Sequence, residues 1–205
     1  MSKPKNWPDS FPYLESPLHA KDLTPTQLQA LHTRPVSVAV LPAASTLTPS
    51  PNVHIQPIRD ASHPAHGQFG LFATQNLRPG AFILAYLGRV HAGLESAAES
   101  DYDLWLDREA DVAVDAARQG NEGRFVNDYR GVRERANAVF GTGWCERWGE
   151  VCVGVWVAGG KNAGKGIRRG DEILVSYGKG FWAERRHAEG GGEEERGGDA
   201  KTSWG

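Results

Sequence analysis

The chain has 205 residues, 40% of them hydrophobic, and a formal net charge of -2 at pH 7. A chain of this size can bury one core, so we expect one domain with tails rather than two domains. The charge lacks the strong positive balance of proteins that neutralise nucleic-acid phosphates, so we expect no direct binding of nucleic acid.

The two cysteines, Cys145 and Cys152, are too few for a disulfide framework or, by themselves, for a four-ligand zinc site. We expect both to be buried, reduced thiols, and we predict no metal site. The sequence has no apolar run of about 18 residues, and its first residues form no apolar signal segment, so we predict neither a membrane span nor secretion. An intracellular location, in the nucleus or the cytoplasm, is expected.

Residues 1–51 form a proline-rich segment, and ten of the twelve prolines lie between Pro4 and Pro57. Because proline disrupts regular layers, this segment predicts an extended arm laid over or beside the domain. The arm contains one predicted short helix, because Thr24-Pro25-Thr26-Gln27 has the form of a capping box with proline at the first helical position.

Residues 52–187 alternate short apolar runs with glycine, proline and asparagine, a texture that favours short strands and tight turns over a long amphipathic helix. The predicted strands lie at 53–55, 70–73, 81–87, 102–106, 112–114, 151–157 and 173–175. Residues 188–205 are rich in glycine and glutamate, and we predict a disordered tail there. The sequence therefore predicts a mainly β domain between an arm and a tail.

Several segments of this domain carry motifs in a fixed order. The first is a glycine loop that enters a strand, Gln68-Phe69-Gly70-Leu71-Phe72-Ala73. A strand with a Tyr-x-Gly exit follows, containing Tyr86, and next come Ser100 to Asp107, containing Tyr102, and Val114-Asp115-Ala116. Each is ordinary strand sequence by itself, so the information lies in their order and spacing.

Two longer segments follow, and they are more specific. The central one is Gly120-Asn121-Glu122-Gly123-Arg124-Phe125-Val126-Asn127-Asp128-Tyr129-Arg130-Gly131, with a further asparagine at Asn137. The last one is Gly170-Asp171-Glu172-Ile173-Leu174-Val175-Ser176-Tyr177-Gly178, followed by Phe181-Trp182.

Together these segments resemble, over residues 53 to 184, the motifs of the SET-domain protein-lysine methyltransferases. The resemblance implies a SET-domain β-clip of several small sheets, with short helices only and a knot-like crossing of the C-terminal segments. It also implies S-adenosylmethionine as cofactor and methyl transfer to a lysine side chain of a protein substrate, with histones as one substrate class. In this interpretation residues 52–187 are the SET domain.

The resemblance also assigns roles to individual residues. Tyr177 corresponds to the catalytic tyrosine, and Tyr86 and Phe140 correspond to the wall of the channel that admits the lysine. The implied cofactor-binding residues are Gln68, Phe69, Tyr102, Arg124, Asn127, Asp128 and Trp182. The acidic residues Glu95, Glu99, Asp101 and Asp103 occupy the stretch that frames the substrate groove in this family and could attract a basic peptide.

The chain departs from the family pattern in the central motif. Asp128, Tyr129 and Arg130 stand where the family usually has histidine, serine and cysteine, and Gln68 replaces the first glycine of the first motif. No cysteine follows Cys152, so the cysteine-rich zinc segment that some members carry after the last motif is missing. These departures leave a second function open, a non-catalytic SET module that binds a peptide or protein partner, whereas the tyrosines and Asn127 favour the enzyme.

Overall fold

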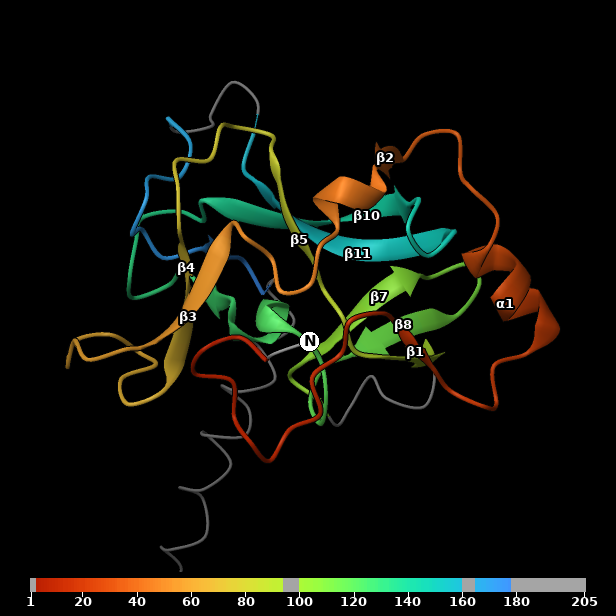
Figure 1. The fold of residues 1–205 in the computed structure, drawn as a ribbon, viewed down its shortest axis with the longest axis horizontal. Coiled ribbons are helices and arrows are strands. Elements are labelled where there is room, and N and C mark those ends of the chain that lie inside the picture. Colours follow the sequence, from red (N-terminus) through yellow and green to blue (C-terminus); the bar gives the residue numbers. More distant parts are fainter. Residues whose placement is uncertain (1–2, 94–99, 160–164, 178–205) are drawn as a thin grey trace, which may run out of the picture.

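The structure is a computed structural model that describes residues 3–93, 100–159 and 165–177. Figure 1 shows strands gathered into several small sheets, with the N-terminal quarter of the chain running along them. The predicted fold class, mainly β with small sheets and short helices, is confirmed. Within the described ranges, no helix is long and apolar enough to cross a membrane.

Two four-stranded sheets form the body of the fold. The first has the order β1-β6-β8-β7, from Leu18–His19, Arg89–Ala92, Val112–Asp115 and Asp103–Asp107. The second has the order β2-β10-β11-β5, from Ala39–Leu41, Ala138–Cys145, Glu150–Val157 and Phe82–Ala85. Two smaller sheets pair β3 (Val53–Pro57) with β4 (Phe69–Ala73), and β9 (Asn127–Asp128) with β12 (Leu174–Val175).

The N-terminal arm is built into both large sheets. Its strand β1 pairs in parallel with β6, and its strand β2 pairs in parallel with the C-terminal end of β10. Trp7 is only 6% exposed and belongs to the main core, where its ring meets Phe125 edge to face. The arm therefore supplies edge strands to both large sheets and a residue of the main core.

The predicted short helix is α1 (Pro25–Leu31). Both bonds of the capping box are present, because the Thr24 hydroxyl accepts from the Gln27 amide and the Gln27 side chain accepts from the Thr24 amide. Among the described residues, short 3-10 turns occur at Ala43–Ser45 and Glu122–Phe125. The second turn ends just before β9, so the residue at which the turn begins helps to set the position of the central motif.

Asn121 fixes the start of that turn. The side chain is fully buried, and its Oδ1 accepts from the amides of Leu87 and Gly123 while its Nδ2 donates to the Ala85 carbonyl. Burial of a side-chain amide is costly unless its hydrogen bonds are made, and here both ends have partners. The turn is therefore tied to the end of β5.

The two C-terminal motifs meet in the small parallel sheet. Asn127 lies opposite Leu174, and Asp128 lies opposite Val175. Asn137 holds the same crossing from the other side, because its side chain donates to the Glu172 carbonyl and accepts from the Leu174 amide. The two side-chain bonds of Asn137 join residues that are 35 and 37 positions apart in the sequence.

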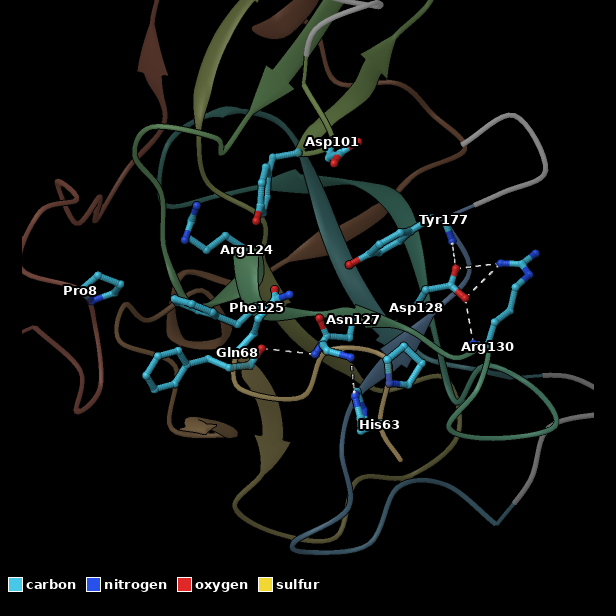
Figure 2. Close-up of a pocket in the computed structure, with 14 residues that line it drawn as sticks. Pro8, His63, Gln68, Asp101, Arg124, Phe125, Asn127, Asp128, Arg130 and Tyr177 are labelled. Atoms are coloured by element: carbon cyan, nitrogen blue, oxygen red, sulfur yellow. Dashed lines mark hydrogen bonds and ion pairs between the residues drawn. The ribbon is translucent and has the colours of Figure 1, made fainter. Parts of the chain in front are cut away.

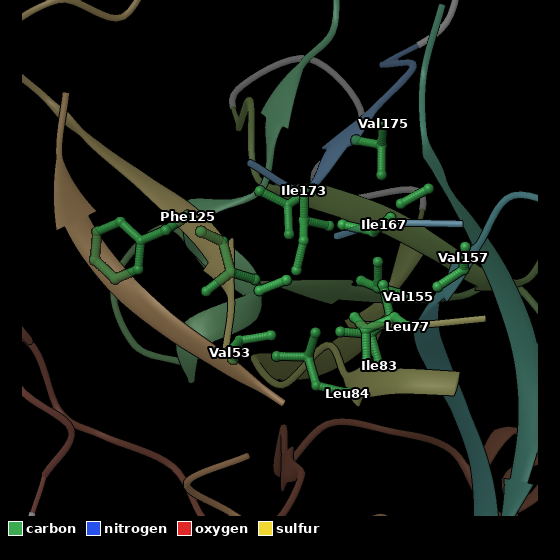
Figure 3. Packing of buried hydrophobic residues seen from close by; sticks show 14 of the residues in the cluster. Val53, Leu77, Ile83, Leu84, Phe125, Val155, Val157, Ile167, Ile173 and Val175 are labelled. Carbon is green, nitrogen blue, oxygen red and sulfur yellow. The ribbon is translucent and has the colours of Figure 1, made fainter. Parts of the chain in front are cut away.

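The main core lies beneath this crossing (Figure 3). It includes Ile83, Val155 and Ile173, each fully buried, together with Phe125 from the central motif. Cys145 and Cys152 are free and buried, as predicted. The predicted tail at 188–205 lies outside the described residues, and the boundaries proposed at 51/52 and 187/188 remain predictions.

Candidate active site

A cavity of about 410 Å³ opens beside the crossing of the two motifs (Figure 2). Seven of the predicted site residues line it, namely Gln68, Phe69, Tyr102, Arg124, Asn127, Asp128 and Tyr177. They come from four separate segments of the sequence, the start of β4, the start of β7, the central motif and the last motif. The fold therefore brings together residues that the sequence only suggested as a group.

A second, smaller cavity of about 210 Å³ adjoins the first. The predicted channel residues Tyr86 and Phe140 line it, with their rings edge to face at a centroid distance of 5.7 Å. The two cavities share four lining residues, Asp101, Tyr102, Arg124 and Tyr177. Tyr177 thus lines both the larger cavity and the smaller one that contains the rings of Tyr86 and Phe140.

The two channel tyrosines both use their hydroxyl protons within the protein. The Tyr177 hydroxyl donates to the Val126 carbonyl at 2.7 Å, and the Tyr86 hydroxyl donates to the Tyr102 carbonyl at 2.7 Å. Burial raises the pKa of Tyr86 well above its ordinary value, and the neighbouring Tyr177 acts in the same direction. Tyr86 therefore stays a neutral phenol.

Arg124 supplies a fixed positive charge to both cavities. Its Nε and Nη2 donate to the carbonyls of Ala116 and Ala117, and its guanidinium packs over the rings of Phe11 and Tyr102 at 4.4 and 4.8 Å. Its remaining nitrogen, Nη1, has no hydrogen-bond partner within residues 3–93, 100–159 and 165–177. The guanidinium is thus held in place with one donor group available for an anionic group in the cavity.

Asp128 is the residue at which the chain departs most from the family pattern, and its carboxylate takes part in the crossing. Its Oδ2 accepts from the Tyr177 amide at 2.8 Å, and its Oδ1 accepts from the Arg130 amide at 2.8 Å. The Arg130 guanidinium also contacts both oxygens. Figure 2 shows Asp128 between Tyr177 and Arg130, so the substituted residues tie the catalytic candidate to the central motif.

Asn127 points its side chain away from Asp128 into another contact. Its Nδ2 donates to Glu172 Oε1 at 2.9 Å and to the Phe69 carbonyl at 3.3 Å. A methyl group added at Gly70 would lie 2.5 Å from that same Glu172 oxygen. The packing therefore requires glycine at position 70 of the first motif.

Several cavity residues were not among the predicted site residues. They are Pro8, His63, Pro64, Ala65, Phe125 and Arg130. Pro8 belongs to the arm and His63 to Ala65 belong to the loop before β4, and no motif marks either segment. Phe125 and Arg130 stand inside the central motif, so the sequence contained a signal for these two only.

One predicted residue, Trp182, lies outside the described residues, as do Glu95 and Glu99. Asp101 lines both cavities, whereas Asp103 lines the smaller one and pairs with His91 at 3.1 Å. In the described segments no group of three or more metal-ligating side chains could hold a metal ion.

The structure thus has the features that the motif order implied. Its two C-terminal motifs pair as adjacent strands, and the last tyrosine stands between an open cavity and an aromatic channel. This pairing of the two motifs is the arrangement that the resemblance to SET domains implies. The roles assigned to the individual residues remain predictions.

Comparison with solved structures finds similarity to polycomb repressive complex 2 from Chaetomium thermophilum. One such structure has a TM-score of 0.48 and 22% identity, over 63% of this chain and 15% of that chain. Another, in an autoinhibited conformation bound to S-adenosylmethionine, has a TM-score of 0.46 and 19% identity, over 66% of this chain and 17% of that chain. The chain thus spans less than a fifth of the length of those chains. No family model and no curated protein matches the sequence.

Proposed function

We propose that this chain is an S-adenosylmethionine-dependent methyltransferase that acts on a lysine side chain of a protein substrate. The observation that carries the proposal is the junction of the two cavities at Tyr177. The larger cavity has a volume within the range of about 300–1,000 Å³ that small-molecule sites usually have. The smaller one is walled by Tyr86, Phe140 and Tyr177, which suits an unbranched alkyl chain.

The residues of the larger cavity fit the cofactor by charge and shape. The cofactor has a carboxylate, which suits the available Arg124 donor, and a flat adenine ring, which suits the aromatic side chains of Phe69 and Phe125. When bound, S-adenosylmethionine supplies a methyl group attached to a positively charged sulfur. Asp101 and the Tyr177 phenol oxygen provide negative charge where the two cavities meet, which suits this positively charged sulfur.

The channel has to favour the neutral form of the lysine amine. A lysine with an ordinary pKa near 10.4 is almost entirely protonated at pH 7, and the neutral amine then costs about 4 to 5 kcal/mol. A narrow aromatic channel disfavours the charged form because it removes water from the ammonium group. Burial of Tyr86, which is 5% exposed, and its contact with Phe140 provide such an environment.

Tyr177 is the proposed catalytic residue. Because its hydroxyl donates to the Val126 carbonyl, its oxygen can accept a hydrogen bond from the amine and orient the amine lone pair toward the methyl group. Asp128 fixes the backbone of Tyr177 through the amide bond described above. The proposed contribution of the chain is therefore alignment and desolvation, without a general base.

The first test is calorimetric titration of the full chain with S-adenosylmethionine and S-adenosylhomocysteine, with ATP as a control ligand. We expect both cofactor forms to bind and ATP not to bind. Methyl transfer from radiolabelled cofactor to histones and to proteins of a cell lysate then tests turnover. We expect Tyr177→Phe to keep cofactor binding and to lower the transfer rate by about 100-fold or more.

Tyr129→Phe is the matched control, because Tyr129 stands in the central motif but lines neither cavity. We expect it to leave the transfer rate unchanged. Absence of cofactor binding by the wild-type chain would refute the proposal. Cofactor binding without transfer to any protein would favour the alternative, a SET module that binds a peptide, and an unchanged rate in Tyr177→Phe would refute the assigned mechanism.

A further inference from the structure

The loop that joins β3 to β4, residues 58–68, forms one wall of the larger cavity. His63, Pro64 and Ala65 from its middle line the cavity. The loop is closed at its base by two backbone bonds, from the Ile58 amide to Gln68 and from the Gly67 amide to Ile58. Its middle extends beyond these bonds, so its position over the cavity depends on contacts with other parts of the fold.

Two contacts hold the middle of the loop. The Pro64 ring packs so closely on Gly131 that a methyl group added at Gly131 would lie 2.6 Å from Pro64 Cγ. The second contact is polar, because His63 Nε2 lies 3.0 Å from Glu172 Oε2. The side chains of His63 and Glu172 are only 8% and 9% exposed, so solvent screens this contact little.

The hydrogen bonds of His63 define which ring nitrogen carries the proton. The Ala65 amide donates to His63 Nδ1 at 3.0 Å, so Nδ1 is an acceptor and carries no proton. His63 Nε2 is therefore the N–H that donates to Glu172. A carboxylate is an acceptor only, and this one receives one donor at each oxygen, His63 at Oε2 and Asn127 at Oε1.

The hydrogen bonds from His63 to Glu172 and from Asn127 to Glu172 link three parts of the site. His63 stands in the cavity wall, Glu172 in the last motif and Asn127 in the central motif. Asn127 also donates to the Phe69 carbonyl, so these bonds also reach the first motif. If His63 were displaced, the 58–68 loop would lose its polar contact with the rest of the fold. The buried Glu172 carboxylate would also lose one of its two donors, which would make the position of Asn127 less fixed.

We propose that His63 is a positioning residue of the larger cavity, which holds the 58–68 loop as a wall of the cofactor site and fixes Glu172 and Asn127 behind it. The proposal rests on the proposed function, because the ligand in question is the cofactor. It assigns a role to a residue that stands outside every motif of the resemblance. The role is indirect, since His63 acts through the loop and through Glu172.

The test compares the full-length wild-type chain with three variants. His63→Ala removes the contact, and His63→Gln keeps an N–H donor at about the position of Nε2. His66→Ala is the matched control, because His66 is an exposed histidine of the same loop that does not line the cavity. For each protein we would measure the dissociation constant of S-adenosylhomocysteine by calorimetry, amide hydrogen exchange of residues 58–68, and KM and kcat of methyl transfer.

We expect His63→Ala to raise the dissociation constant and the cofactor KM by about tenfold, the order of one lost hydrogen bond to a charged group, while kcat at saturating cofactor stays within about twofold. Amide exchange of the loop should become faster in this variant. His63→Gln should recover most of the affinity, and His66→Ala should match the wild type.

Three results would overturn the inference, and they differ from one another. Unchanged loop exchange in His63→Ala would show that the contact does not hold the wall. If amide exchange of the loop were faster in His63→Ala but cofactor affinity were unchanged, His63 would hold the loop without contributing to cofactor binding. Failure of the wild-type chain to bind cofactor would refute the proposed function, and with it the assignment of His63 to that ligand, whatever the loop exchange shows.

Discussion

Replacement of Asp128 by asparagine tests how the crossing of the two motifs is held. The carboxylate of Asp128 accepts from two backbone amides on different oxygens, Arg130 on Oδ1 and Tyr177 on Oδ2. Asparagine has the same shape but only one acceptor oxygen, so in either orientation its NH₂ group faces an amide donor. Asp128 is 8% exposed, so water cannot readily replace the lost partner.

The expected cost follows from these contacts. One backbone hydrogen bond to a charged acceptor is worth about 1.5–3 kcal/mol. The Arg130 side chain is 35% exposed, so the loss of its ion pair adds less than about 1 kcal/mol. We expect Asp128→Asn to lower the free energy of unfolding by about 2–3 kcal/mol, which for a chain of this size lowers Tm by about 5–10 °C.

Urea and thermal denaturation followed by circular dichroism would measure this change. Arg130→Ala is the control, because it removes the ion pair but leaves the bond between Asp128 and the Tyr177 amide. We expect it to lower Tm by less than half as much, and we expect Asp128→Asn to weaken cofactor binding as well. Equal losses in the two variants, or a Tm shift below about 1 °C in Asp128→Asn, would refute the argument that the carboxylate pins Tyr177.

Two further predictions concern buried contacts near the site. Gly70→Ala places a methyl group 2.5 Å from Glu172 Oε1. We therefore expect urea denaturation to show a free energy of unfolding lower by about 1–3 kcal/mol, together with weaker cofactor binding. Unchanged values would mean that Glu172 moves aside without cost. Burial raises the pKa of Glu122 above its ordinary value, so the folded state holds that proton more tightly and this group's contribution to stability falls as pH rises above about 4.5. We therefore expect Glu122→Gln to gain stability relative to the wild type between pH 4.5 and pH 7, measured by urea denaturation at several pH values, and a constant difference would contradict this.

The sequence predicted the strands whose side chains form a clear apolar run. β3, β4, β5, β7, β8, β11 and β12 all overlap predicted runs. β10 was not predicted, because Gly141, Thr142 and Gly143 interrupt its apolar pattern. At Gly143 close packing requires glycine, because a methyl group there would lie 2.9 Å from the Leu41 side chain in β2.

The arm shows a second limit of prediction from sequence. Strands β1 and β2 have two and three residues, which is too short for an alternating pattern to be recognised. Their positions are set by the sheet edges that they cover. Phe11 over Arg124 and Pro8 in the cavity wall likewise depend on where the arm lies, which no local motif encodes.

The grouping of the predicted site residues around the cavities could be predicted where those residues belong to motifs. Nine of the ten predicted site residues line the two cavities, because the order of the motifs reflects the path of the backbone around them. The substituted central motif was harder to interpret from sequence. The bond from the Tyr177 amide to the Asp128 carboxylate joins the two motifs, and no sequence motif indicated this contact.

The way the arm and the crossing are joined bears on how this protein folds as it is synthesised. Tyr13 bridges Gly120, Leu41 lies opposite Cys145, and Asp128 lies opposite Val175, so pairings that define the site join residues about 50 to 110 positions apart. Such non-local pairings form slowly because long loops must close before any contact rewards them. During synthesis on the ribosome, the Trp7 ring therefore stays without its Phe125 contact until the central motif has been synthesised.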